Sequence, residues 1–109
     1  MTMLKLTSLV AVALAGILAT ASHAPAARPA SVGIKDFTYG PAVLTVPVGA
    51  QVTWTNHDEE SHTITSTTGA FGSAGLSHDE TFTQTFARPG TYAYFCALHP
   101  QMRATVVVR

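Results

Sequence analysis

The sequence contains little charge and almost no cysteine. Asp, Glu, Lys and Arg make up 11% of the 109 residues and the formal net charge is zero, which excludes the basic surface that nucleic-acid-binding domains need. Cys96 is the single cysteine, so a disulfide within the chain is excluded. A phosphate-binding G-x-x-x-x-G-K loop and a G-x-S-x-G nucleophile motif are also absent. The unpaired cysteine is therefore the residue whose chemistry most needs an explanation.

The N-terminal end is strongly apolar. Lys5 is the one charged residue in positions 1–24, an apolar stretch covers residues 6–21, and small residues follow it. This pattern predicts a secretory signal peptide cleaved after Ala24, with cleavage after Ala21 as a second candidate. A retained membrane anchor is the alternative, but the stretch is shorter than the roughly 20 apolar residues of a membrane span. Residues 25–31, rich in proline and alanine, are expected to form a disordered lead-in.

The remaining residues, 32–109, are predicted to form one all-β domain. Apolar and polar residues alternate in short segments separated by Gly- and Pro-containing turns, and no amphipathic helix pattern occurs. About seven or eight such strands predict a Greek-key antiparallel β-sandwich. An immunoglobulin-like sandwich is less favoured because those domains typically bridge two cysteines. The expected strands are residues 32–37, 43–46, 51–56, 62–66, 80–86, 91–95 and 104–108, with a bend at 37–41 and a loop at 67–77.

Three potential metal ligands share one short loop between the last two expected strands. Cys96, His99 and Met102 supply a thiolate, an imidazole and a thioether, each separated from the next by two residues. Soft sulfur ligands together with imidazole select copper or zinc. Calcium and magnesium prefer oxygen ligands and are excluded.

A fourth ligand must come from elsewhere in the chain, and His62 is the best candidate. It begins an expected strand directly after the charged turn at residues 57–60. Two histidines, one thiolate and one weakly bound methionine make up the blue-copper type of site. Zinc is satisfied by cysteine and histidine but gains little from a thioether, so Met102 favours copper.

Each of these residues also has a simpler interpretation. Cys96 alone could be a buried structural thiol, Met102 a core residue, and His62 a surface or capping residue. The combination of C-x-x-H-x-x-M with export and a sandwich fold favours a ligand set. His57 and His78 lie among acidic residues, which predicts solvated turns rather than further ligands.

The segments WTN…SHTIT and GTYAYFCALHPQM…TVVV resemble the cupredoxins, the family of small blue copper proteins. The short ligand loop is most similar to that of the amicyanin branch, and the resemblance covers residues 32–109. It implies that one copper ion is bound by His62, Cys96, His99 and Met102. Many members have asparagine after the first histidine ligand, where it braces the cysteine loop. Thr63 stands there in this chain, and Asn56 and Thr63 are expected to support the ligands from behind.

The resemblance further implies a periplasmic one-electron carrier, not an enzyme, whose copper cycles between Cu(I) and Cu(II). The imidazole edge of His99 would reach the surface through a docking patch formed with Ala97, Leu98 and Pro100. Expected partners are transient redox proteins, with an amine dehydrogenase and a cytochrome c as possibilities. The mature protein is expected to be a monomer that binds neither nucleic acid nor membrane. The alternative is a periplasmic copper carrier or storage module, although such proteins usually use several Met or His in open chains. An oxidative copper enzyme would need an open coordination position or a second metal.

Overall fold

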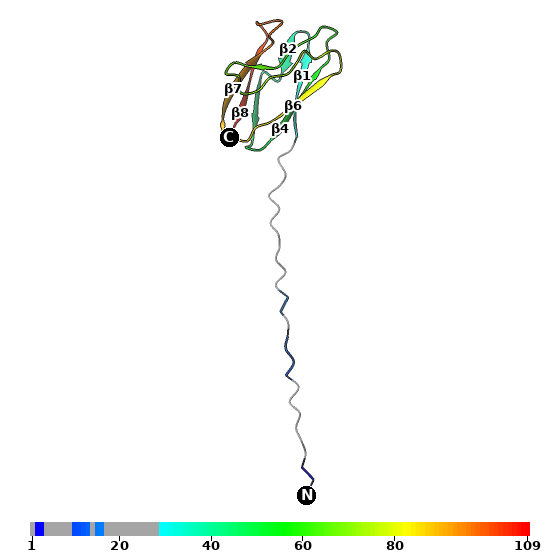
Figure 1. Cartoon of the computed structure of the whole chain (residues 1–109), viewed down its shortest axis with the longest axis vertical. Helices are drawn as coiled ribbons and strands as arrows, with labels where there is room; N and C mark the ends of the chain where they lie inside the picture. Colours follow the sequence, from blue (N-terminus) through cyan, green and yellow to red (C-terminus); the bar gives the residue numbers. More distant parts are fainter. Residues whose placement is uncertain (1, 4–9, 14, 17–28) are drawn as a thin grey trace.

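The computed structural model describes residues 2–3, 10–13, 15–16 and 29–109, and its folded part is a sandwich of two four-stranded sheets (Figure 1). The expected all-β sandwich is thereby confirmed. Most of the predicted signal peptide and most of the predicted lead-in lie outside the described residues. The strands are β1 (Ala30–Lys35), β2 (Thr38–Gly40), β3 (Val43–Val46), β4 (Gln51–Asn56), β5 (Thr65–Ser66), β6 (Thr81–Thr85), β7 (Gly90–Phe95) and β8 (Arg103–Val108).

The pairing of the strands is mixed rather than purely antiparallel, which corrects the expectation. One sheet has the order β2-β1-β4-β6 and the other β3-β8-β7-β5. In each sheet one pair is parallel, namely β1 with β4 and β3 with β8. Both pairs join strands that are distant in sequence, and the chain passes through the other sheet between them. A tight hairpin requires antiparallel pairing, whereas a long connection of this kind permits parallel pairing. Alternation of apolar residues is the same in both arrangements, so it could not distinguish them.

The period-two pattern of the sequence decides which side chains face the interior. In β4, Val52 and Trp54 are buried, and in β8, Val106 and Val108 are buried, whereas their neighbours are more exposed. Successive side chains of a strand point to opposite faces. Each sheet therefore presents one apolar face, and the two faces pack together.

Two predicted elements differ from the structure. β2 was expected to be a bend, but residues 38–40 pair with β1 through a two-residue turn at Asp36 and Phe37. That turn lacks the Asn-Gly or Gly-containing signal that usually marks a tight hairpin. β5 was expected to begin at His62 but covers only Thr65–Ser66. His62 instead makes an isolated bridge with Leu76.

Aromatic rings fill the centre of the sandwich around Trp54, which is fully buried. The rings of Phe82 and Tyr94 lie 5.7 and 5.5 Å from it between centroids, and Phe71 and Phe86 complete the cluster. Aromatic rings bury large apolar areas and favour the tilted and edge-on arrangements seen here. This core holds the ends of β4 and β7 in place, and both strands lead directly into the loops described below.

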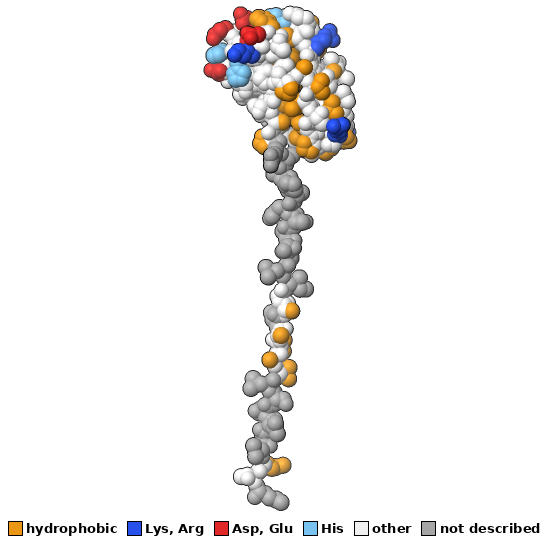
Figure 2. All heavy atoms as spheres, turned by 180° about the vertical axis from the view of Figure 1, so that it is seen from behind, with side chains coloured by type: hydrophobic (Ala, Val, Ile, Leu, Met, Phe, Trp, Pro, Cys, Tyr) orange, Lys and Arg blue, Asp and Glu red, His pale blue; other side chains and the backbone are white. Residues whose placement is uncertain are grey.

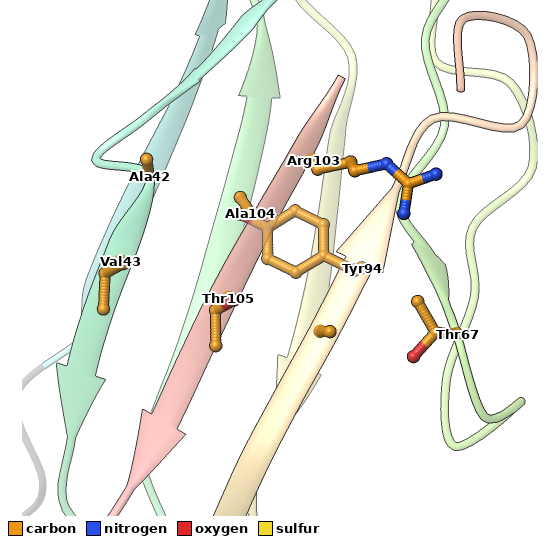
Figure 3. A pocket seen from close by; sticks show the side chains of 8 residues that line it. Ala42, Val43, Thr67, Tyr94, Arg103, Ala104 and Thr105 are labelled. Carbon is orange, nitrogen blue, oxygen red and sulfur yellow. The ribbon is translucent and has the colours of Figure 1, made fainter. Parts of the chain in front are cut away.

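The surface has two notable features. Asp and Glu side chains gather at the top of the domain in Figure 2, the end at which the β7–β8 loop lies in Figure 1. A groove of about 380 Å³ runs along β3, β7 and β8, where Tyr94 and Arg103 are part of its lining (Figure 3). The groove lining contains no histidine, cysteine or carboxylate, so it offers no metal-binding chemistry.

In the described part of the chain, no helix has the length and apolar character needed to cross a membrane.

Candidate metal centre

The loop from Cys96 to Met102 is closed by its own backbone. The N–H of His99 donates to the carbonyl of Cys96 at 3.2 Å, and the N–H of Met102 donates to the carbonyl of His99 at 2.9 Å. The N–H of Cys96 in turn donates to the carbonyl of Met102 at 3.1 Å. Pro100 lies at the tip and restricts the unfolded loop further. The C-x-x-H-x-x-M spacing thus corresponds to a tight turn with its two ends joined.

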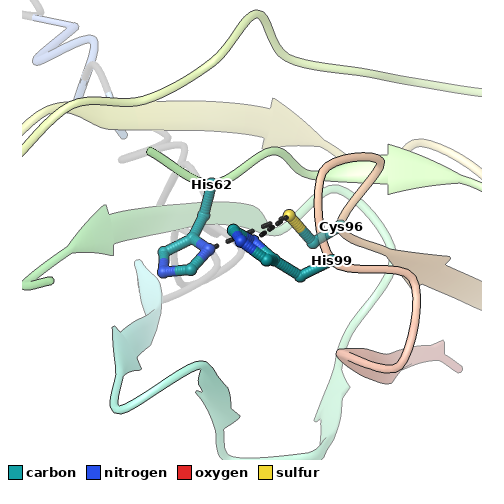
Figure 4. Close-up of side chains that lie close together, drawn as sticks. All are labelled: His62, Cys96 and His99. Carbon is teal, nitrogen blue, oxygen red and sulfur yellow. Dashed lines mark hydrogen bonds between the residues drawn. The ribbon is translucent and has the colours of Figure 1, made fainter. Parts of the chain in front are cut away.

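Three of the predicted ligands meet at one point (Figure 4). The Sγ of Cys96 lies 3.8 Å from Nδ1 of His62 and 3.7 Å from Nδ1 of His99, and the three potential ligand atoms all lie within 4.8 Å of one another. A transition-metal ion about 2.0 Å from nitrogen and about 2.3 Å from sulfur, with a trigonal angle between the bonds, separates these atoms by about 3.7 Å. The donor set and its spacing therefore fit a metal ion held by two imidazoles and a thiolate.

Met102 lies at the end of the same loop. Its side chain is only 4% exposed and belongs to the buried core together with Cys96. A thioether added to a two-histidine, one-cysteine set distinguishes blue-copper sites from zinc sites. His62, Cys96, His99 and Met102 accordingly form the candidate copper-ligand set.

The environment of Cys96 favours its ionised form. Burial by itself raises the pKa of a thiol, but hydrogen bonds to Sγ outweigh this effect and lower the pKa of Cys96 to about 6. The backbone N–H of Thr63 donates to Sγ at 3.4 Å, and the rings of His62 and His99 add to the effect. At neutral pH this environment favours the thiolate of Cys96, the form that binds metals.

Asp58 fixes the orientation of His62. The Nε2–H of His62 donates to Oδ2 of Asp58 at 2.8 Å, which leaves Nδ1, the atom facing Cys96, with a free lone pair. Burial by itself raises the pKa of Asp58, but the N–H groups of Phe37 and Asp36, together with His62, hold that pKa below its ordinary value. The expectation of a solvated acidic turn is wrong for Asp58, which is only 9% exposed. The carboxylate tolerates burial because it accepts three hydrogen bonds.

Asn56 lies behind the segment that leads to His62. Its side chain is fully buried, and its Oδ1 accepts the N–H of Asp58 at 2.9 Å. Its Nδ2 donates to the carbonyls of Glu60 and Leu76, both at 2.8 Å. The amide therefore braces the turn between β4 and His62 from the inside.

Thr63 joins the two halves of the site. Its Oγ1 accepts the N–H of Ala97 at 2.8 Å and shares a hydrogen bond with Oγ1 of Thr65 at 2.8 Å. Its own backbone N–H donates to Cys96. Threonine thus links the His62 segment to the cysteine loop at this position through a hydroxyl acceptor rather than an amide.

The residues of the predicted docking patch lie on the outside of the loop. Leu98 is 56% exposed, Ala97 and Pro100 are exposed, and His99 is half-buried. His57 and His78 lie apart from the ligand set: His57 is exposed, and the ring of His78 is within 3.2 Å of Asp79.

Two residues that sequence analysis missed also contact the site. Asp58 could have been found from the rule that a metal-bound histidine gives its other ring N–H to a carboxylate or carbonyl group. Phe37 packs its ring edge-on against both imidazoles, with centroid separations of 4.9 Å to His62 and 4.8 Å to His99. No local sequence signal indicates that contact, because residues 37 and 99 meet only through the fold.

The geometry agrees with the result of comparison with known protein families. A family model described as "Cupredoxin-like domain" matches residues 8–108 of this chain. The chain belongs to the cupredoxin family. This cupredoxin is 37% identical over 82 residues to the amicyanin of Paracoccus denitrificans; the match covers 71% of this chain and 63% of that relative's length. It is 31% identical over 99 residues to the amicyanin-alpha of Methylorubrum extorquens, covering 86% of this chain and 82% of the relative.

Solved structures show the same fold. A reduced Cu(I) form of a mutant amicyanin at pH 4 superimposes on this cupredoxin with a TM-score of 0.71 and 31% identity, covering 74% of this chain and 82% of the other. The match therefore extends over most of both molecules. The chain is a cupredoxin similar to the amicyanins.

Proposed function

We propose that this cupredoxin is a periplasmic one-electron carrier with one type 1 copper ion, held by His62, Cys96, His99 and Met102. The observation that carries the proposal is the placement of two imidazole Nδ1 atoms 3.7 and 3.8 Å from a single thiolate. The similarity to amicyanins and the export signal expected at residues 1–24 support the assignment of carrier and compartment.

The bound copper supplies the change between Cu(I) and Cu(II). The protein supplies a site already assembled by Asp58, Thr63 and the closed loop, so that little rearrangement accompanies gain or loss of an electron. Its donors are two nitrogens and two sulfurs from a rigid framework, which is a set that both oxidation states tolerate. A single compact site of this kind supports electron transfer rather than turnover of a substrate.

The electron is proposed to pass through His99. Its ring contacts Cys96 on the inside, and its neighbours in the loop, Ala97, Leu98 and Pro100, are exposed apolar residues. Transient redox complexes use small contact areas of this kind. We propose an amine dehydrogenase as electron donor and a cytochrome c as acceptor, with the protein acting as a monomer.

Electron self-exchange between two copies tests the patch without knowledge of the partner. Leu98→Glu places a charge on the contact surface, and like charges repel when two copies meet there. We expect self-exchange, measured by NMR line broadening in mixtures of the oxidised and reduced protein, to slow at least several-fold while the visible spectrum is unchanged. Val43→Glu makes the same substitution at another exposed residue, which is 63% exposed, and should affect the rate much less.

Three results would count against the proposal. Loss of the visible band in Leu98→Glu would place Leu98 within the metal site rather than on the patch. Equal self-exchange rates in both variants and the unmodified protein would exclude the patch. Transfer of copper to a chelator within the mixing time, without measurable self-exchange, would favour the alternative of a copper carrier or storage module.

A further inference from the structure

The turn between β1 and β2 has an unusual backbone. Asp36 and Phe37 occupy the two central positions, with φ angles of 53° and 58°. Left-handed backbone is rare for residues other than glycine and is an outlier for bulky side chains. Residues held in such conformations cluster at functional sites, where the surrounding structure fixes them.

Asp58 is the group that fixes this turn. Its Oδ1 accepts the N–H of Asp36 at 2.7 Å, and its Oδ2 accepts the N–H of Phe37 at 2.9 Å. The same Oδ2 accepts the Nε2–H of His62. One buried carboxylate therefore holds both the strained turn and the first imidazole, and it places them in a fixed relation to each other.

The side chain of Phe37 is not part of the hydrophobic core. It is 39% exposed, and it belongs neither to the buried core nor to the half-buried hydrophobic residues packed on that core. It stands edge-on to His62 and to His99, with interplanar angles of 84° and 86°. Edge-to-face contact is the favoured arrangement of aromatic rings. The strained turn thus presents one ring to both imidazoles at the same time.

The two imidazoles differ in how they are held. His62 is fully buried and is hydrogen-bonded through Nε2 to Asp58. His99 is half-buried on the loop, and among residues 29–109 it has no carboxylate partner comparable to Asp58. The ring of His99 contacts Cys96, the ring of His62 and the ring of Phe37.

We propose that Phe37 is a positioning residue that keeps the imidazole of His99 turned towards Cys96. Its functional consequence rests on the proposed copper site, although the ring contact itself does not. Without the Phe37 ring, the His99 side chain gains freedom to rotate outwards. Copper then leaves the protein more easily, because its most exposed nitrogen ligand is no longer restrained.

Three variants test this role. Phe37→Leu removes the ring but keeps an apolar side chain on the same backbone, Phe37→Tyr keeps the ring, and Phe82→Leu removes a ring from the Trp54 cluster instead. Release of copper to excess EDTA, followed by decay of the visible band, should be about two- to ten-fold faster in Phe37→Leu. Phe37→Tyr and Phe82→Leu should release copper at the rate of the unmodified protein.

A second measurement needs no copper. In the metal-free protein, NMR relaxation of the His99 ring should show greater mobility in Phe37→Leu than in the unmodified protein or Phe37→Tyr. Phe37→Met, which also lacks a ring, replaces Phe37→Leu if that variant does not fold. Unchanged ring mobility and unchanged copper release would overturn the role of Phe37 and leave the proposed function intact. Failure of the unmodified protein to form a blue site would overturn the proposed function, while the relaxation comparison would still decide the role of Phe37.

Discussion

The carboxylate of Asp58 is surrounded by hydrogen-bond donors, and its negative charge strengthens the hydrogen bonds that it accepts. It accepts hydrogen bonds from two backbone N–H groups and from His62. Hydrogen bonds that involve a charged group are stronger than neutral ones, and an unsatisfied buried partner is costly. Substitution by asparagine preserves the size of the side chain and removes the charge, so it isolates this effect.

We predict that Asp58→Asn lowers the free energy of unfolding of the metal-free protein by about 1–3 kcal/mol at neutral pH. The pKa of Asp58 is lowered in the folded protein, so the carboxylate stabilises the fold above its unfolded pKa of about 3.9. That contribution is lost as the pH falls through the lowered folded value. Urea unfolding should therefore show a gap between the two proteins that is full at neutral pH and narrows in acid.

Asp79→Asn is the matched control, because Asp79 is 73% exposed. Its free energy of unfolding should stay within about 0.5 kcal/mol of the unmodified protein, as is usual for surface substitutions. Equal stability of Asp58→Asn and Asp79→Asn at neutral pH would contradict the role given to Asp58.

Sequence patterns predicted the sulfur ligands and histidines better than the residues that hold them. Cys96 and His99 are close in sequence, so their spacing alone indicated a shared loop. Asp58 and Phe37 act through contacts made by the folded chain, and the acidic segment around Asp58 has the composition of a solvated turn. That carboxylate can be buried because the β1–β2 turn supplies two backbone N–H donors to it. Sequence periodicity does not reveal this contact.

The segment around Thr63 and the β7–β8 loop depend on each other. The hydroxyl of Thr63 is the acceptor for the N–H of Ala97, and the N–H of Thr63 is a donor to Cys96. β5 begins only at Thr65, so His62 and Thr63 are held by these contacts and by Leu76 rather than by a continuous strand ladder. A strand was expected here because β-branched residues are enriched. The backbone N–H of Thr63 instead donates to Cys96, and His62 makes an isolated bridge with Leu76.

We predict that Thr63→Ala lowers the free energy of unfolding of the metal-free protein by about 1–2 kcal/mol, because the N–H of Ala97 loses its acceptor. Thr63→Ser keeps the hydroxyl and should recover most of the loss. Urea unfolding measures both values, and the visible spectrum of the copper-loaded variants shows whether the site is disturbed. A Thr63→Ser variant as unstable as Thr63→Ala would mean that the methyl group, not the hydrogen bond, is responsible.

The sandwich as a whole concentrates its negative charge at one end. Exposed carboxylates lie at the end that carries the metal centre (Figure 2), and Glu59 and Asp79 are 84% and 73% exposed. Lys35 ends β1 and Arg103 begins β8, so two cations also lie at the metal-centre end. Arg88, which precedes β7, and Arg109, which follows β8, lie at the opposite end. The composition reveals only that the net charge is zero; the acidic end arises from the positions that the fold gives to each loop.

This acidic end predicts a salt effect that depends on the sign of the redox probe. Reduction of the Cu(II) protein by hexaammineruthenium(II), a cation, should slow as salt is added, because screening weakens its attraction to the acidic end. Reduction by hexacyanoferrate(II), an anion, should accelerate. A Glu59→Gln, Glu60→Gln double variant should flatten both salt dependences, measured by stopped-flow, more than Arg88→Gln alters them. The same sign of salt dependence for both probes would contradict the prediction.

The fold class and the approximate strand positions followed from period-two alternation and turn residues, since these report directly on which side chains are buried. The parallel pairs did not, because β1 and β4 meet only after the chain has crossed to the other sheet and back. The β1–β2 hairpin also escaped notice, since Asp36 and Phe37 are not residues that usually form such a turn. The elements that sequence could not predict are those that bring distant segments to the metal centre.

The central claim is that Cys96 is a copper ligand in a blue site. The most direct measurement is a visible absorption spectrum of the purified protein titrated with Cu(II), beside a Cys96→Ala variant. We predict an intense thiolate-to-copper charge-transfer band that saturates at one equivalent of copper and is absent in the variant. A protein that stays colourless and binds zinc instead, or that binds copper without this band, would leave Cys96 with a structural role and contradict the electron-carrier account.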